Sequence, residues 1–308
     1  MSTLLFTHDA CFAHDTGAHH PERPERLRAV LDALDGPAFS KLVRRQAPAA
    51  AQEDVARPHS RRYVEALLGA IPKEGHAALD ADTIISPGSG EAALRAAGAV
   101  TAAVDAIMAG EATNAFCAVR PPGHHAERER AMGFCLFNNV AVGALRAREV
   151  HRLERAAVID FDVHHGNGTQ AMFEDDPHLF YGSTHQFPLY PGTGARNETG
   201  VGNICNAPLR PNAGSAEFRT AFNEFILPAL EDFRPDFLLI SAGFDAHRRD
   251  PLAQLNLVEA DFAWATERLV ELAGRHCKGR IVASLEGGYD LEALAASTAA
   301  HVAALMAA

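Results

Sequence analysis

The chain has little of what several large classes of protein require. Its five cysteines are an odd number and form no Cys-x-x-Cys pair, which argues against a disulfide framework and against a thiolate zinc site. No apolar run reaches the ~18 residues of a transmembrane helix, and the N-terminus lacks the basic flank and apolar core of a signal peptide. These absences favour a reducing, cytoplasmic setting and no membrane partner.

Positive charge is also scarce. The sequence has 28 Lys and Arg against 39 Asp and Glu, a formal net charge of -11. A nucleic-acid-binding face needs an excess of positive charge to neutralise phosphates, so we expect no nucleic-acid partner. A negative surface field suits cationic substrates such as lysine-rich peptides or polyamines. An oligomer is possible, but the composition does not determine the oligomeric state.

Short apolar segments alternate with longer amphipathic segments along the chain. The short segments are typical of strands buried on both faces of a parallel sheet. The alternation predicts an α/β fold with a central, mostly parallel sheet and helices on both faces. Since no linker or repeat interrupts it, we expect residues 1–308 to form a single domain. The predicted strands are Thr3–Thr7, Ala115–Val119, Ala156–Phe161, Leu179–Ser183, Phe237–Ser241 and Arg280–Ser284, and the predicted helices are Glu91–Met108, Ala216–Glu231, Ala260–Gly274 and Leu291–Met306.

Polar residues gather directly after four of the predicted strands. In open parallel sheets, functional groups collect beyond the carboxyl ends of the strands. One such cluster would be unremarkable, but four at the same edge predict an active site. The clusters are Arg120–His125, Asp160–His165, Gly243–Asp245 and Glu286–Tyr289.

The second cluster has the spacing of a metal site. In an extended segment alternate side chains share one face, so Asp160, Asp162 and His164 can point the same way. Asp162 and His164 supply one oxygen and one nitrogen donor, and Asp245 is the best candidate for the third ligand. Three protein ligands leave a position open for water or substrate, as in a catalytic site. The set is rich in oxygen, so ferrous iron and manganese compete with zinc on ligand type alone.

Two adjacent histidines offer acid–base chemistry. His124 and His125 stand on a loop beside the predicted metal, and imidazole titrates near neutral pH. Asp160 is suited to accept the far N–H of one histidine, and Asn167 could orient the other more weakly because it is neutral. The alternative interpretation is that the two histidines are metal ligands or part of an ordinary polar loop.

The last cluster contributes a phenol. Tyr289 follows two glycines, so a flexible loop could bring its hydroxyl over the metal to stabilise an oxyanion. The alternative is a packed aromatic side chain. Two glycine-bearing loops at 133–139 and 187–194 carry aromatic residues that could line a narrow tunnel.

Taken together, these segments resemble the histone deacetylase superfamily, which has an arginase-like fold. The motifs occur in the order that the family has them and span much of the chain. Each motif is moderately specific, and the ordered set is highly specific. The matching segments are HHPERPERL at 19–27, RPPGHHA at 120–126, GFCLFNN at 133–139, IDFDVHHGNGTQ at 159–170, YPGTG at 190–194, SAGFDAHRRDPL at 241–252 and LEGGYD at 285–290.

The resemblance implies a single histone deacetylase-like catalytic domain and a role for each cluster. His125 and a zinc ion would activate water for attack on an acetyl carbonyl. The zinc ion and Tyr289 would stabilise the oxyanion, and protonated His125 would help the amine leave. The implied zinc ligands are Asp162, His164 and Asp245, and the implied catalytic residues are His124, His125, Asp160, Asn167 and Tyr289, with Asn167 and the FDAHRRDPL loop resembling class II members.

The resemblance also implies a structural potassium ion and a substrate-binding wall. Asp82, or else Asp80, matches an acid that holds the substrate backbone, and Arg26 matches an arginine below the acetyl pocket. The implied potassium ligands are Asp160, Asp162, His164, Ser183 and Thr184, and the implied substrate-binding residues are Gly133, Phe134, Tyr190, Leu252 and Asp82.

The resemblance implies removal of an acetyl or related acyl group from an amine, with an acetylated lysine side chain as the first candidate and an acetylated polyamine or other small amide as the alternative. Leu252 occupies the place where polyamine-preferring relatives carry an acidic residue, which favours acetyl-lysine. Two other functions compete with deacetylation. A ureohydrolase of the related arginase fold would need a two-metal cluster with more aspartates, and the histidine pair and Tyr289 argue against it. A non-catalytic acyl-binding protein would not need the full set of catalytic residues that this chain has.

Overall fold

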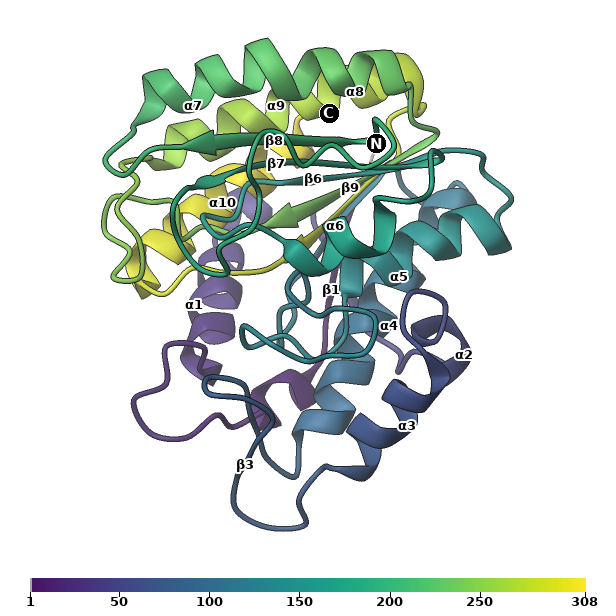
Figure 1. Ribbon diagram of the computed structural model, residues 1–308, viewed down its shortest axis with the longest axis vertical. Helices are drawn as coiled ribbons and strands as arrows, with labels where there is room; N and C mark the ends of the chain where they lie inside the picture. Colours follow the sequence, from purple (N-terminus) through teal and green to yellow (C-terminus); the bar gives the residue numbers. More distant parts are fainter. Residues whose placement is uncertain (1) are drawn as a thin grey trace.

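An eight-stranded parallel sheet forms the centre of the protein in the computed structural model, which describes residues 2–308 (Figure 1). Its strand order is β2-β1-β5-β10-β9-β6-β7-β8, and each adjacent pair runs parallel. The α/β fold with a central parallel sheet is therefore confirmed. The strands are β1 (Thr3–Thr7), β2 (Val43–Gln46), β5 (Asn114–Cys117), β6 (Ala156–Asp160), β7 (Leu179–Gln186), β8 (Ile204–Leu209), β9 (Phe237–Ala242) and β10 (Ile281–Leu285), and a separate antiparallel pair consists of β3 (Ala77–Ala78) and β4 (Ile84–Ile85).

The inner strands could be predicted from the sequence because both of their faces are buried. Every position of β5, β6, β7, β9 and β10 is buried, because helices cover both faces of the sheet. Apolar, β-branched side chains satisfy both faces at once. All six predicted strands are present, with ends that differ by a few residues.

The two edge strands were not predicted. The β2 segment, VRRQ, is largely exposed and charged, and β8 contains Asn206 and Pro208. An edge strand pairs on one side, so it tolerates charge and a residue without an N–H, and these residues also discourage pairing with another chain. Edge strands therefore lack the apolar run that reveals an inner strand.

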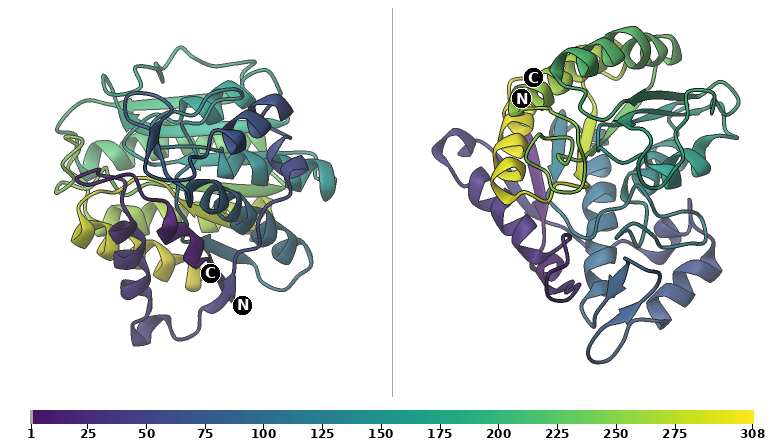
Figure 2. Two further views of the ribbon diagram at one scale, coloured as in Figure 1. Left: turned by 90° about the horizontal axis from the view of Figure 1, so that it is seen from below. Right: turned by 60° about the vertical axis from the view of Figure 1, so that its left-hand side comes forward.

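Helices cover the sheet in two layers (Figures 1 and 2). One layer contains α1, α7, α8, α9 and α10, and the other contains α2 to α6. The four predicted helices are present, although the segment at 216–231 is α7 and α8 joined by a π-helical turn at Phe222–Ile226. The helices are α1 (Pro24–Leu34), α2 (Gln52–Val55), α3 (Arg61–Gly69), α4 (Ser89–Met108), α5 (Asn139–Leu145), α6 (Asn167–Phe173), α7 (Ser215–Ala221), α8 (Leu227–Phe233), α9 (Glu259–His276) and α10 (Leu291–Met306). Among these described helices, none has both the length and the hydrophobicity to cross a membrane.

The strand register brings the polar clusters together. Asp160, the last residue of β6, lies opposite Ser183 of β7 and Ser241 of β9. Ser284 of β10 pairs with Ser241 and with Cys117 of β5. The loops after β5, β6, β9 and β10 therefore leave the sheet side by side at its carboxyl edge.

Candidate metal centre and active site

Asp162, His164 and Asp245 form a compact buried triad. One possible ligand atom from each residue lies within 4.8 Å of the other two. His164 Nδ1 is 3.2 Å from Asp162 Oδ1 and 3.1 Å from Asp245 Oδ2. The first two residues follow β6 and the third follows β9. Two carboxylates and one imidazole around a common point are a donor set suited to a divalent cation.

The electrostatics of the triad also suit a cation. Burial, and then the charge of Asp162, raise the pKa of Asp245 to about 6. Burial opposes ionisation of Asp162 as well, but His124 and His164 hold the pKa of that carboxyl below its usual range. Two adjacent buried carboxylates repel each other, and a bound cation would relieve that repulsion.

A glycine lets the backbone approach the triad closely. A Cβ atom on Gly287 would lie 2.1 Å from Asp245 Oδ2 and 2.6 Å from Asp162 Oδ2. The Gly287 N–H donates to Asp162 Oδ2 at 2.8 Å. Any side chain at this position would displace the carboxylates, so the triad itself requires glycine at position 287.

His124 pairs with a carboxylate. Its Nδ1–H donates to Asp160 Oδ2 at 2.9 Å, and its Nε2 is 3.8 Å from Asp162 Oδ2. Burial disfavours the imidazolium, but Asp160 and then Asp162 outweigh it and raise the pKa of His124 to about 10. His124 is therefore a cation at neutral pH. Tyr181 supports the pair by donating its hydroxyl to Asp160 Oδ2.

His125 pairs with an amide. Its Nδ1 is 2.9 Å from Asn167 Oδ1, while Asn167 Nδ2 donates to Glu127 Oε1 at 2.8 Å. The donor to Glu127 fixes the orientation of the amide, so Asn167 Oδ1 accepts from His125 Nδ1–H. Burial, and then the neighbouring His124 and His164, lower the pKa of His125 well below its usual value. His125 is thus neutral at pH 7, with a free lone pair on Nε2.

The loop that carries both histidines is held from β10. Glu286 Oε2 accepts from the Gly123 N–H at 2.6 Å and from the His124 N–H at 3.1 Å. The side chain is fully buried, and burial raises the pKa of Glu286 to about 7. Sequence reasoning gave Glu286 no role, although a charged residue ending an apolar strand was a signal that could have identified it.

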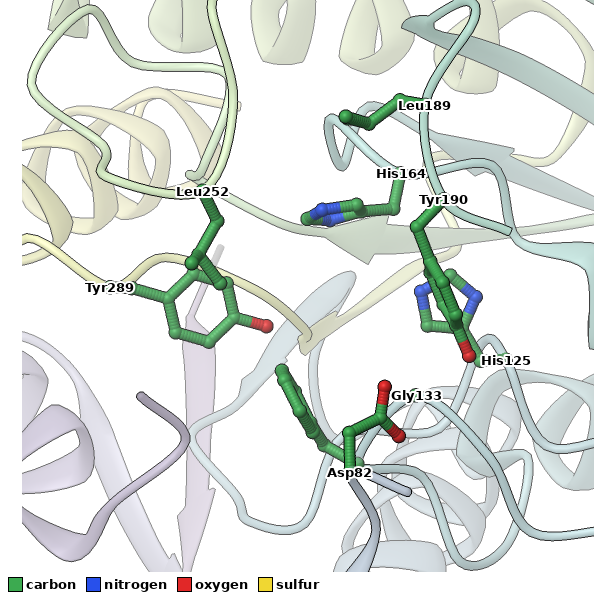
Figure 3. A pocket seen from close by; sticks show the side chains of 9 residues that line it. Asp82, His125, Gly133, His164, Leu189, Tyr190, Leu252 and Tyr289 are labelled. Carbon is green, nitrogen blue, oxygen red and sulfur yellow. The ribbon is translucent and has the colours of Figure 1, made fainter. Parts of the chain in front are cut away.

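The triad opens into a cavity of about 230 Å³ (Figure 3). Its walls are mostly apolar or aromatic. His125 and His164 line the part of the cavity next to the triad, and Asp82 contributes a carboxylate to the lining. Tyr289 lies across the cavity from His125, with its hydroxyl directed into the space between them. The cavity is lined by Asp82, His125, Gly133, Phe134, His164, Leu189, Tyr190, Leu252 and Tyr289.

The structure thus places all five residues of the predicted substrate wall in one cavity. Gly133 has a positive φ of 56°, and a Cβ there would lie 2.5 Å from His125 Cδ2, so this turn requires glycine. Leu189 was not predicted to line the cavity. It lies in the aromatic loop at 187–194, beside Tyr190, which was predicted.

Comparison with known sequences identifies the family. The family profile described as Histone deacetylase domain matches residues 20–305. The chain belongs to the histone deacetylase family.

The alignments with named relatives extend over almost the whole of this histone deacetylase family member. The histone deacetylase-like amidohydrolase of Pseudomonas aeruginosa is 39% identical over 311 residues, which cover 94% of this chain and 82% of the relative. The human polyamine deacetylase HDAC10 is 39% identical over 301 residues, which cover 92% and 44%. The crystal structure of the HDA15 HD domain matches with a TM-score of 0.93 at 34% identity, covering 99% of this chain and 88% of the other. The chain is therefore a hydrolase of a family that acts on amides.

A buried cluster of charged side chains lies next to Tyr289 in this histone deacetylase family member. Glu22 accepts from Arg120 Nε at 2.5 Å and from Arg26 Nη1 at 3.0 Å. Burial opposes the charge of Glu22, but Arg120 and Arg26 outweigh it and lower the pKa of the carboxyl to about 2. The Arg26 guanidinium lies 4.9 Å from the centroid of the Tyr289 ring. From the sequence, Arg26 was matched to an arginine below the acetyl pocket, whereas Glu22 and Arg120 lay in segments matched to the site but were given no role of their own.

Of the predicted potassium ligands, Asp160 ends β6 and Asp162 and His164 follow it, while Ser183 and Thr184 lie within β7. Asp160 and Ser183 are register partners, and Ser183 Oγ is 2.9 Å from His185 Nδ1. Thr184 Oγ1 is buried and has no hydrogen-bond partner among residues 2–308. Potassium binding at this position stays a prediction.

Proposed function

We propose that this chain is a zinc-dependent deacetylase that hydrolyses the acyl-amide of an N-ε-acetyl-lysine side chain, with residues 1–308 acting as one catalytic domain. One observation carries the proposal. His164 of the buried Asp162–His164–Asp245 triad lines one cavity together with Tyr289 and with His125, whose Nδ1 is held by Asn167.

Asp162, His164 and Asp245 would hold the zinc ion. Three protein ligands in a site that opens into a cavity are the catalytic arrangement, and the repulsion between the two carboxylates favours a cation there. When bound, the ion supplies Lewis-acid polarisation of the acyl carbonyl and lowers the pKa of water.

Three side chains of the protein transfer protons or stabilise charge during the reaction. His125 Nε2 accepts a proton from the attacking water and returns it to the departing amine nitrogen. His124 keeps its positive charge throughout, because Asp160 stabilises the imidazolium. The Tyr289 hydroxyl donates a hydrogen bond to the oxyanion that forms as water adds to the carbonyl.

The cavity favours a slender substrate. Apolar and aromatic walls, including Phe134, Tyr190 and Leu252, match a chain of methylene groups, which gains stability when it leaves water. Asp82 lies at the cavity, where its carboxylate can accept from the backbone N–H groups of a peptide. An acetylated lysine combines these features.

An acetylated polyamine is the second candidate. Human HDAC10, a relative at 39% identity, is named a polyamine deacetylase, and the net charge of -11 attracts polycations. Against it, Leu252 presents a hydrocarbon side chain to the cavity, and leucine provides no charge for a second ammonium group.

The decisive experiment compares acetate release from an acetyl-lysine peptide and from acetylputrescine, with and without a chelator. Chelator-sensitive release with the higher kcat/KM on the peptide would support the proposal. A preference for acetylputrescine would retain the chemistry and assign the polyamine substrate. No release from either compound by zinc-loaded protein would contradict both acetyl substrates and would move the search to longer acyl groups and other small amides, with non-catalytic acyl binding as the remaining function if these also fail.

A metal measurement tests the triad separately from activity. Asp245→Ala leaves two ligands, so we expect the purified variant to retain less than about a tenth of the wild-type zinc by elemental analysis, because affinity depends on every ligand. Asp105→Ala, a similar change on the outer surface of α4, is the matched control and should leave the zinc content unchanged. Full zinc in Asp245→Ala would refute the ligand assignment.

A further inference from the structure

One carboxylate joins the two loops that carry Leu252 and Tyr289. Asp250 Oδ2 accepts from the Tyr289 N–H at 2.7 Å, and Asp250 Oδ1 accepts from the Leu252 N–H at 3.0 Å. The side chain of Asp250 is buried, with 7% of the residue exposed. Leu252 and Tyr289 both line the cavity, so Asp250 stands behind the wall and contacts two of its members through their backbones.

The same peptide group is held from its other end. Arg26 Nε donates to the Gly288 carbonyl oxygen at 2.6 Å, and that oxygen belongs to the peptide bond whose N–H contacts Asp250. A buried cation therefore holds the oxygen of the Gly288–Tyr289 peptide, and a buried carboxylate holds its N–H. The Arg26 guanidinium is ionised, and hydrogen bonds to ionised groups are about twice as strong as neutral ones, while Asp250 accepts one N–H at each of its two carboxyl oxygens.

This peptide needs such a restraint. Gly287 and Gly288 precede Tyr289, and Gly288 has a φ of 126°, so the backbone here has wide conformational freedom. The glycine at 287 cannot be replaced without displacing the metal triad. An uncompensated change in ψ of Gly288 or φ of Tyr289 would redirect the Cα–Cβ bond of Tyr289 and move its phenol from its position in the cavity.

We propose that Asp250 is a positioning residue for Tyr289: by holding the Gly288–Tyr289 peptide opposite Arg26, it places the phenol hydroxyl in the cavity and ties it to the Leu252 wall. Asp250 is not among the residues that line the cavity, and its side-chain hydrogen bonds within residues 2–308 go to backbone N–H groups. It acts through Tyr289, and the inference therefore rests on the proposed function, in which Tyr289 stabilises the oxyanion.

The test is a double-mutant cycle with wild type, Asp250→Asn, Tyr289→Phe and the double variant, assayed on whichever acetyl substrate has the higher kcat/KM. Asparagine keeps the shape but has one acceptor and one donor, so one N–H loses its partner. We expect kcat of Asp250→Asn to fall about 30- to 100-fold, as for a misplacement of about 1 Å, with KM within about threefold. Because both changes remove the same hydrogen bond to the oxyanion, the double variant should be no slower than Tyr289→Phe alone.

The matched control is Arg249→Ala. Arg249 joins the same two segments through ion pairs with Asp290 and Glu292, but its side chain is half-exposed. An exposed ion pair contributes little, so kcat should stay within about twofold of wild type. Zinc content and melting temperature of every variant show whether it is folded and loaded.

The outcomes separate the inference from the proposed function. Unchanged turnover in Tyr289→Phe would refute the role of Tyr289. A slow Tyr289→Phe with a normal Asp250→Asn, or with losses that multiply in the double variant, would overturn only the positioning role. If Asp250→Asn does not fold, Asp250→Glu, which keeps both acceptors but adds a methylene, replaces it in the cycle with the same expectation.

Discussion

His124 and His125 follow each other in one loop, and their ring centroids are 4.0 Å apart. Burial lowers the basicity of both, yet the pKa of His124 is raised to about 10 while that of His125 is lowered. The difference comes from their partners, because Asp160 carries a charge and Asn167 does not. The His124 cation then lowers the pKa of His125 further.

The comparison shows how one His-His pair can supply two functions. A pair of titratable groups whose environments push their pKa values apart can provide a fixed charge and a proton acceptor side by side. A cation in the triad would take up charge from Asp162, but it leaves the contact between Asp160 and His124 in place. The assignment of His125 as the base therefore depends on Asn167 and Asp160 rather than on the histidines themselves.

Removal of each imidazole should give the largest effect. His125→Ala deletes the base, so kcat should fall about 10³-fold, in the range of general acid–base catalysis. His124→Ala deletes a charge without removing the base, and we expect a loss about tenfold smaller. Steady-state rates of both zinc-loaded variants measure the difference. A greater loss in His124→Ala would reverse the two roles.

Asp160→Asn should give His124 a neutral amide partner, as His125 already has in Asn167. Without the carboxylate, the pKa of His124 falls, and its positive charge is lost as pH rises through this lower pKa. We expect kcat at pH 8 to drop about 10- to 100-fold, and the alkaline fall in activity to begin at lower pH than in wild type, since a carboxylate partner raises the pKa of a histidine by about one to three pH units. The pH profile is the readout, and an unchanged alkaline limb would contradict it.

Asn167→Asp should have the smallest effect on the maximal rate. The new carboxylate raises the pKa of His125, and the base must be neutral to work, so activity is lost at a higher pH on the acid side. We expect the acid limb of kcat/KM to move up by about one pH unit, with kcat on the plateau within about fivefold.

The companion change in this experiment concerns Glu127. Asn167 Nδ2 donates to Glu127 Oε1, so Asn167→Asp alone would set two carboxylates against each other. Asn167→Asp with Glu127→Gln restores the donor and isolates the effect on His125, while Glu127→Gln alone is the control. An acid limb that stays in place in the double variant would show that His125 does not limit the rate at low pH.

Local patterns were enough to predict the inner sheet and the polar clusters at its carboxyl edge. Apolar runs identify β6 and β9 because both faces of these strands are buried. The alternation in Asp160-x-Asp162-x-His164 places three polar side chains at one strand end. The edge strands β2 and β8 were missed because they have one pairing neighbour and tolerate Arg44, Arg45 and Pro208.

The hydrogen bonds that hold the site in place could not be predicted from local patterns. Glu286 holds the Gly123 N–H across 163 residues of sequence, and Asp250 holds the Tyr289 N–H across 39. Both contacts are made to backbone groups, which have no residue type and leave no pattern in the sequence. The sequence shows Glu286 directly after β10 and Asp250 in the loop that follows β9. It does not show which backbone group either carboxylate contacts.

The amino-acid sequence by itself determined the parallel sheet, the order of the motifs and the donor types that gather at the carboxyl edge, because each depends on periodicity or on chemistry within a few residues. The tertiary structure alone decided which histidine contacts Asp160 and which contacts Asn167, which peptide group Asp250 restrains and how large the cavity is. These properties depend on distances between segments far apart in the chain and on the exclusion of water, and both arise only when the layers pack together.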